Sequence, residues 1–208
     1  MENTLETKIN EIKAWLGSGS INIFGLPFSG KDTHGTELSR FFNAAFISGG
    51  DILRSSAGPE HIKKHIAKGH LAPTDEYLAI VLPYLSQDEL KDKPLILSSV
   101  GRWQGEEKSI LTATSESGHE IKAVVFLSVT QEEAYRRWKL AERGREDDVA
   151  EDILENRFNE FQQKTLPVLE AYRKRGLVIE VDGMPPKAQV TQDILDKLLE
   201  FAHNLKAA

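Results

Sequence analysis

The stretch INIFGLPFSGKDT spans residues 21–33 and joins a short apolar run to a glycine-rich turn. Residues 25–31 fit the pattern G-x-x-x-x-G-K, with an expected strand before the turn and an expected helix after it. A turn in that position aims backbone N–H groups at one point, where the helix dipole also favours negative charge. Lys31 can then reach the outer phosphates of a nucleotide. The stretch predicts a phosphate-binding loop; the alternative is an ordinary turn with an incidental lysine.

Short apolar runs alternate with helix-length segments along the rest of the chain. The runs lie at residues 21–24, 45–47, 94–97, 124–127 and 178–181. Turn residues or charges bound each of them, as is typical of short buried strands. Five such runs alternating with helices predict a mostly parallel sheet covered on both faces, and therefore an α/β fold. No repeat or linker divides residues 21–208, so we expect a single domain there.

The first 20 residues predict a separate amphipathic helix and a linker. Leu5, Ile9, Ile12 and Leu16 recur at helical spacing, and the sequence GSGS at residues 17–20 then ends the pattern. We expect the apolar stripe of this helix to pack on the domain itself. A helix that binds a partner is the alternative.

Composition excludes several classes of protein. The 208 residues contain no cysteine, which rules out disulfides, thiolate zinc sites, iron–sulfur clusters and a cysteine nucleophile. A formal charge of −6 argues against a surface built for nucleic acid. No signal peptide or membrane-spanning run is evident, so we expect a cytoplasmic protein that binds neither nucleic acid nor a membrane.

Six segments, in order along the chain, together resemble the adenylate kinases and related nucleoside monophosphate kinases. The segments are residues 25–33 (GLPFSGKDT), 47–54 (ISGGDILR), 68–75 (KGHLAPTD), 101–102 (GR), the set Asp147, Asp148, Arg157, Thr165 and Pro167, and 181–183 (VDG). The family patterns that they resemble are G-x-P-G-x-G-K-G-T, I-S-T-G-D-x-L-R, K-G-x-L-V-P-D, D-G-F-P-R, D-D…R…T-x-P and V-D-G. The resemblance covers about residues 21–205.

The resemblance implies a fold and an activity. The fold is a three-layer α/β/α P-loop fold with a five-stranded parallel sheet, a helical monophosphate-binding insert at about residues 48–85 and a short lid at about residues 136–148. The activity is transfer of the terminal phosphate of ATP, bound with Mg²⁺, to AMP, which gives two ADP. We expect a monomer. The alternatives are the same chemistry on GMP or another nucleoside monophosphate, and a nucleotide-binding protein that has lost catalysis.

The resemblance also assigns roles to residues. Phosphoryl transfer needs positioning and charge neutralisation, which a ring of Arg and Lys side chains supplies. The residues implied for catalysis are Lys31, Arg102, Arg145 and Arg157. Those implied for ATP binding are Pro27, Ser29, Gly30, Lys31, Asp32, Thr33 and Arg137. Those implied for monophosphate binding are Gly49, Arg54, Ala72, Ser99, Arg102 and Glu106.

Three departures from the family pattern bear on the chemistry of the site. Ser98 replaces the carboxylate that orients magnesium-bound water in the family, and Asp51 or Asp32 is expected to serve in its place. Gly49 replaces a threonine near the acceptor.

The third departure concerns the acceptor base. Glu106 replaces a glutamine, and an amide suits adenine because it both donates and accepts, whereas a carboxylate only accepts. Gln104 restores the amide if the turn after Trp103 is shorter, and an exposed Glu106 is a further alternative. The acceptor base therefore stays open between adenine and guanine.

Overall fold

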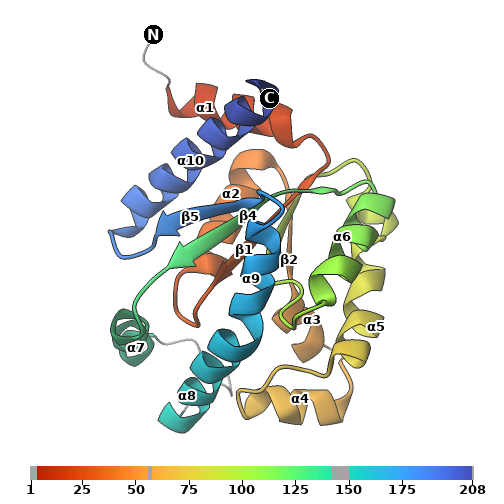
Figure 1. Cartoon of the computed structure of the whole chain (residues 1–208), viewed down its shortest axis with the longest axis vertical. Coiled ribbons are helices and arrows are strands. Elements are labelled where there is room, and N and C mark those ends of the chain that lie inside the picture. The colour runs from red at the N-terminus through yellow and green to blue at the C-terminus, as the bar shows by residue number, and fades with distance from the viewer. Residues whose placement is uncertain (1–3, 56–57, 142–149, 208) are drawn as a thin grey trace.

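Five parallel strands form the centre of the computed structural model, which describes residues 4–55, 58–141 and 150–207 (Figure 1). The strands are β1 (Ser20–Gly25), β2 (Ala45–Ser48), β3 (Leu95–Ser98), β4 (Ile121–Ser128) and β5 (Val178–Asp182). Their order across the sheet is β2-β3-β1-β4-β5, and each neighbouring pair runs parallel. The predicted parallel sheet and its five apolar runs are confirmed.

The central strand β1 is buried on both faces, which explains why its sequence shows no alternation of polar and apolar residues. The side-chain amide of Asn22 is buried in this strand, and its hydrogen bonds are made with the loop that follows β3. Asn22 Nδ2 donates to the Val100 carbonyl at 2.8 Å, and Asn22 Oδ1 accepts from the Val100 N–H at 3.2 Å. This pair ties the end of β3 to β1 and so helps to position the residues that follow both strands.

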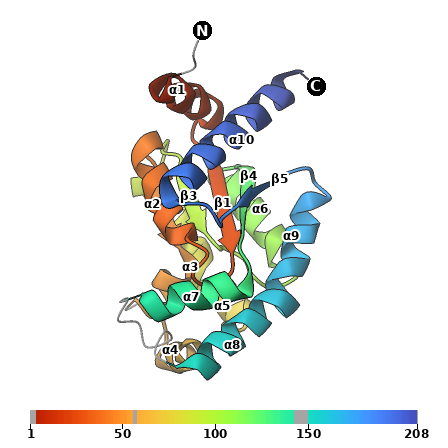
Figure 2. The ribbon, with the colours of Figure 1, turned by 90° about the vertical axis from the view of Figure 1, so that its left-hand side faces the viewer.

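Helices cover both faces of the sheet and divide the core in two. Ile21 and Ile23 of β1 pack with α1 (Leu5–Leu16), α2 (Lys31–Phe42) and α10 (Lys187–Ala207). Phe24 points to the opposite face and packs with α5 (Thr74–Leu85), α6 (Glu106–Glu116) and α9 (Leu166–Arg173). These layers are visible edge-on in Figure 2. The chain therefore has the predicted three-layer α/β/α architecture.

Of the remaining helices, α3 (Gly49–Arg54), α4 (Glu60–Ala67), α7 (Gln131–Leu140) and α8 (Glu151–Glu160) lie beyond the carboxyl ends of the strands (Figures 1 and 2), whereas the 3₁₀ turn η1 (Asp88–Leu90) comes just before the amino end of β3. The π-helical turn η3 (Phe161–Thr165) links α8 to α9. Residues 136–140 of the expected lid form the end of α7, and residues 142–148 lie outside the described residues. The boundaries of the insert and of the lid stay predictions.

The N-terminal helix packs on its own domain, as we expected. Ile12 and Leu16 are fully buried in the core that α1 shares with α10. Polar and aromatic pairs fasten the same two helices together: Lys8 with Asp196, Glu11 with His203, and Trp15 with Phe201. Within the described ranges, no helix is long and apolar enough to cross a membrane.

Candidate active site

The loop between β1 and α2 has the backbone conformation of an anion-binding turn. Gly30 caps the start of α2 at a φ of +97°, which a glycine adopts without strain. Gly25 is required for lack of space, because a Cβ there would approach Ser29 Oγ to 2.4 Å. Lys31 follows at the first position of α2 and is only 8% exposed. The loop therefore presents a helix N-terminus together with a largely buried lysine.

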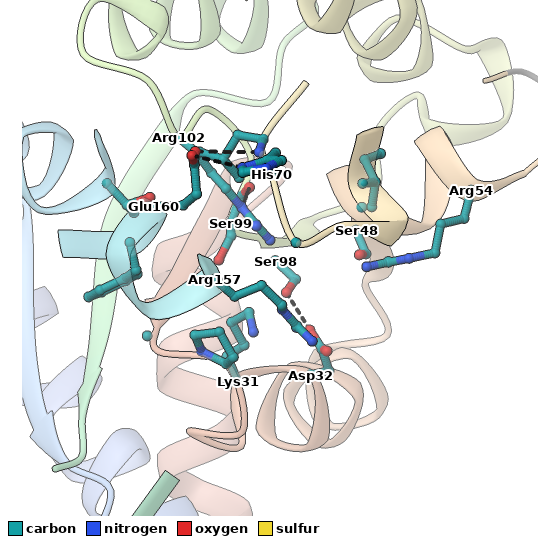
Figure 3. A pocket seen from close by; sticks show the side chains of 18 residues that line it. Lys31, Asp32, Ser48, Arg54, His70, Ser98, Ser99, Arg102, Arg157 and Glu160 are labelled. Carbon is teal, nitrogen blue, oxygen red and sulfur yellow. Dashed lines mark hydrogen bonds and ion pairs between the residues drawn. The ribbon is translucent and has the colours of Figure 1, made fainter. Parts of the chain in front are cut away.

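An open cleft lies where β1, β2 and β3 end. Four cationic side chains line it: Lys31, Arg54, Arg102 and Arg157. They come from four separate segments, namely α2, α3, the loop after β3, and α8. Figure 3 shows Lys31 and Arg157 at one end of this cleft, with Arg54 reaching in from another side. Ligands of parallel α/β sheets bind at this end of the strands.

The electrostatics of Arg102 show how closely these cations gather. Burial lowers the pKa of the Arg102 guanidinium, and the positive charges of Arg157 and Arg54 lower it as well. Tyr77 and Asp32 act in the opposite direction. Since an arginine stays charged at neutral pH, the three guanidinium groups repel one another in the cleft. An anion bound among them relieves that repulsion, and phosphate suits the planar fork of arginine.

The end of β3 carries Ser98 instead of the family's carboxylate, but another carboxylate, that of Asp32, lies beside it. Ser98 Oγ donates to Asp32 Oδ1 at 2.5 Å, so the last residue of β3 and the second residue of α2 meet. Both line the cleft next to Lys31. Asp51 does not line it: its side chain is 51% exposed and pairs with Arg54 at 3.2 Å. Of the two carboxylates predicted to orient magnesium, Asp32 is the one at the cleft.

A smaller, mostly apolar pocket continues from the cleft, with Arg54 and Arg102 lining both. Its walls include Leu53, Ile66, Ala72, Tyr77 and Trp103. Trp103 is held in place because its Nε1–H donates to the Ala72 carbonyl at 3.0 Å, while the Lys164 ammonium lies 3.9 Å from the centre of its ring. A mostly apolar pocket with aromatic walls beside a cation cluster suits a nucleobase attached to a phosphate.

Glu106 lines this pocket and is only 1% exposed. Its Oε2 accepts from the backbone N–H groups of Arg102 at 2.7 Å and Trp103 at 3.0 Å. Burial raises the pKa of the carboxyl group. The alternative of an exposed helix residue is therefore wrong, because the N-terminus of α6 turns inward here. Gln104 is exposed and lines no part of the pocket, so it does not restore the missing amide.

The chain matches the adenylate kinase family model over residues 23–177. The chain belongs to the adenylate kinase family. Among its relatives, the adenylate kinase of Micrococcus luteus is 30% identical over 193 residues, which cover 89% of this chain and 91% of the relative. The adenylate kinase of Thermobifida fusca is 30% identical, covering 85% and 96%. That of Staphylococcus epidermidis is 27% identical, covering 86% and 98%. The chain is thus a phosphotransferase of the nucleoside monophosphate kinase type.

On the far side of the phosphate loop, Gly30, Thr33 and Arg137 line a broad open depression between α7 and the β5–α10 loop. Arg137 is held by its donors, which bond the Ser29 carbonyl at 3.1 Å, the Gly183 carbonyl at 2.7 Å and Glu133 Oε1 at 2.7 Å. Arg137 therefore links the phosphate loop, α7 and the segment after β5. Two other residues were predicted to bind ATP. Pro27 lines the cleft, whereas Ser29 is a buried residue of the phosphate loop.

The monophosphate residues fall into two groups. Ser99, Arg54 and Arg102 line the cleft, and Ala72 and Glu106 line the apolar pocket. Gly49 lines neither, since the phenol of Tyr77 fills the space: a Cβ on Gly49 would approach Tyr77 Oη to 2.5 Å. The Tyr77 hydroxyl therefore lies where a side chain at position 49 would be, and it accepts a hydrogen bond from the Gly101 N–H at 3.0 Å. Arg145 lies outside the described residues.

Sequence reasoning missed Glu160, which lines the cleft three residues after Arg157. Its carboxylate lies 3.4 Å from His70 Nδ1, accepts from the Leu71 N–H at 3.4 Å and pairs with Lys164. Figure 3 shows this group beside Arg102. The spacing from Arg157 puts both side chains on one face of a helix, and that was the available signal.

Proposed function

We propose that the chain transfers the terminal phosphate of Mg–ATP to AMP and produces two ADP. The observation that carries this proposal is the meeting of Lys31, Arg54, Arg102 and Arg157 in one cleft, which continues into a pocket with aromatic and aliphatic walls. A phosphate of either substrate fits among these cations. The order of the elements along the chain and the family membership support the same assignment.

The chemistry follows from charge and position. An oxygen of the AMP phosphate attacks the γ-phosphorus of ATP, and the bond from that phosphorus to the bridging oxygen of ADP breaks. Lys31 and the N–H groups of its loop would hold the donor phosphates, while Arg54 and Arg102 would hold the acceptor phosphate. Arg157 would contact the group in transfer. Positioning and neutralisation of the phosphate charges account for such catalysis, and no covalent intermediate is required.

We propose that ATP binds on the other side of the phosphate loop, where water is also excluded during the reaction. Thr33 and Arg137 would contact ATP in the depression between α7 and the β5–α10 loop. Residues at about 136–148, Arg145 among them, would act as a short lid, and residues at about 48–85 would close over the acceptor. In line with the family resemblance, we also propose a monomer. We also propose that the protein is cytoplasmic.

Magnesium has a suitable partner in Asp32. Mg²⁺ prefers oxygen ligands, retains several waters and is held by one or two carboxylates together with substrate phosphates. The Asp32 carboxylate and the Ser98 hydroxyl supply such oxygens next to Lys31, and we propose that they hold a magnesium-bound water. When bound, the ion neutralises charge on the phosphates during transfer. In this chain the carboxylate would thus come from the start of α2, whereas the family pattern has it at the end of β3.

An exchange of the two residues tests this assignment. Asp32→Ser removes the carboxylate, so we expect a lower kcat and a weaker dependence of ATP affinity on Mg²⁺. The double variant Asp32→Ser, Ser98→Asp returns a carboxylate to the other side of the same contact and should recover a substantial part of both. Calorimetric titration of ATP with and without Mg²⁺ supplies the readout that is independent of turnover. Unaltered activity and Mg²⁺ dependence in Asp32→Ala would contradict the assignment.

Turnover with AMP, GMP, CMP and UMP as acceptors of phosphate from Mg–ATP tests the activity itself. We expect AMP to be preferred. Arg102→Ala should raise the acceptor KM and lower kcat, with a loss of roughly 2 to 4 kcal/mol in transition-state binding. A clear preference for another base would overturn AMP as the acceptor. Binding of a bisubstrate dinucleotide without any transfer would instead indicate a protein that has lost catalysis.

A further inference from the structure

One buried carboxyl oxygen in the apolar pocket lacks a hydrogen-bond partner. Glu106 Oε1 is almost inaccessible to solvent and, among the described residues, no donor meets hydrogen-bond geometry with it, although the Thr74 hydroxyl lies near the carboxyl group. The other oxygen, Oε2, is fixed by the N–H groups of Arg102 and Trp103. A buried acceptor left unpaired costs about 1–3 kcal/mol, and such groups in native proteins call for an explanation. A ligand in the pocket that Glu106 lines provides one.

The fixed orientation of Glu106 limits what Oε1 can do. Because the lone pairs of Oε2 face two N–H groups, a proton on the carboxyl group must sit on Oε1. The neutral acid then presents one O–H donor, and the ionised form presents one acceptor. Adenine carries an acceptor at ring N1, whereas guanine carries an N–H donor there. The same oxygen therefore suits either base, but in a different protonation state for each.

The groups around Glu106 act in both directions. Burial is the largest influence and raises its pKa, while the two backbone N–H groups, the nearby Thr74 hydroxyl and the Arg102 charge lower it. Three further titratable groups line the pocket: Arg54 from α3, His70 from the α4–α5 loop and Tyr77 from α5. Lys164 of η3 lies behind the Trp103 ring. The balance favours the neutral acid more than in an exposed glutamate.

We propose that Glu106 selects the acceptor base through Oε1 and binds adenine as the neutral acid, with Oε1–H donating to ring N1. Binding of AMP to the ionised enzyme then takes up one proton from solvent. Binding of GMP takes up none at Oε1, because guanine N1–H donates to the carboxylate. This proposal rests on the proposed function, in which the pocket holds the acceptor base.

The test is equilibrium binding of AMP and of GMP to the full chain between pH 5.5 and 8.5. Calorimetry in buffers of different ionisation enthalpy counts the protons taken up. Both ligands carry the same phosphate, which itself titrates at about pH 6, so the ratio of their dissociation constants cancels that contribution. Above the pKa of Glu106 in the free protein, we expect Kd(AMP)/Kd(GMP) to rise by about tenfold per pH unit, as one-proton linkage requires.

Two variants separate Glu106 from its surroundings. Glu106→Gln carries a donor and an acceptor at every pH, so AMP should bind without proton uptake and the ratio of dissociation constants should become flat. Glu107→Gln is the matched control: Glu107 is also buried, at 4% exposed, but it accepts from the Gly105 N–H and does not line the pocket. We expect it to retain the wild-type dependence on pH.

The possible outcomes distinguish this proposal from the proposed function. A wild-type ratio independent of pH, or a wild-type slope retained in Glu106→Gln, would overturn the role of Glu106. AMP binding with proton uptake but no phosphoryl transfer would support Glu106 and overturn the kinase activity. Absence of binding by either monophosphate would overturn both.

Discussion

Phe28 shows how a single residue of the phosphate loop can depart from its family pattern. The resembling pattern has glycine at this position, and Phe28 adopts a φ of +64°, in the left-handed region. Its ring is nonetheless buried, at 3% exposed, and the Arg157 guanidinium lies 5.7 Å from the ring centre. The aromatic side chain therefore forms a wall beneath Arg157, and this contact offsets the cost of the backbone conformation.

Two variants at this position should reverse the usual order of stability. Phe28→Ala and Phe28→Gly both lose the ring, but only glycine relieves the left-handed backbone. We expect Phe28→Gly to be more stable than Phe28→Ala by roughly 1 kcal/mol in urea denaturation. Phe41 in α2 is the control, since helical backbone there makes alanine the better replacement by about 0.5–1 kcal/mol. The same order at both positions would contradict strain at Phe28.

Site residues could be predicted from the sequence where a motif carries them. Lys31, Arg54 and Arg102 each follow a strand within a matching segment, and the cleft contains all three. Burial of Glu106 could not be predicted, because the first turn of a helix is usually at the surface and only the folded turn at 101–105 directs it inward. Tyr77 was equally hidden, since its contact with Gly49 joins elements 28 positions apart along the sequence.

At the scale of elements, the strands were the easiest to predict and the π-turn η3 the hardest. Buried parallel strands appear as apolar runs, and all five were found with ends within a few residues. The turn η3 links α8 to α9 and has no comparable sequence signal. It places Phe161 and Thr165, both buried, on the cleft side. Single π-turns often occur at functional sites, where they redirect side chains.

The N-terminal helix α1 contributes stability through two side chains. Ile12 and Leu16 are buried against α10 and leave cavities when shortened. We expect Ile12→Ala and Leu16→Ala each to lower the free energy of unfolding by about 2–5 kcal/mol. Leu5 lies on the same helix but is 48% exposed, so Leu5→Ala should change it by less than about 0.5 kcal/mol. Denaturation in urea measures all three, and equal losses would contradict packing of one face.

For the whole molecule, the net charge of −6 conceals a cationic centre. Acidic residues elsewhere on the chain outweigh Lys31, Arg54, Arg102 and Arg157, which face one another in the cleft. The fold holds these like charges together because α2, α3, the loop after β3 and α8 each contribute one of them and meet at the same end of the sheet. The composition therefore describes the average charge of the molecule correctly but does not indicate the cationic site.

This concentration of charge makes stability depend on ligand. A dinucleotide whose polyphosphate bridges the donor and acceptor sites should contact all four cations. At a free concentration of 100 times its Kd it adds about 2.7 kcal/mol, which for a chain of this size raises Tm by about 5–11 °C. We expect the increase to fall with added salt and to be smaller in Arg102→Ala at the same ligand concentration. Lys93→Ala, at an exposed position after η1, should match the wild type. An equal rise in Tm for wild type and Arg102→Ala would show that the ligand does not bind among these cations.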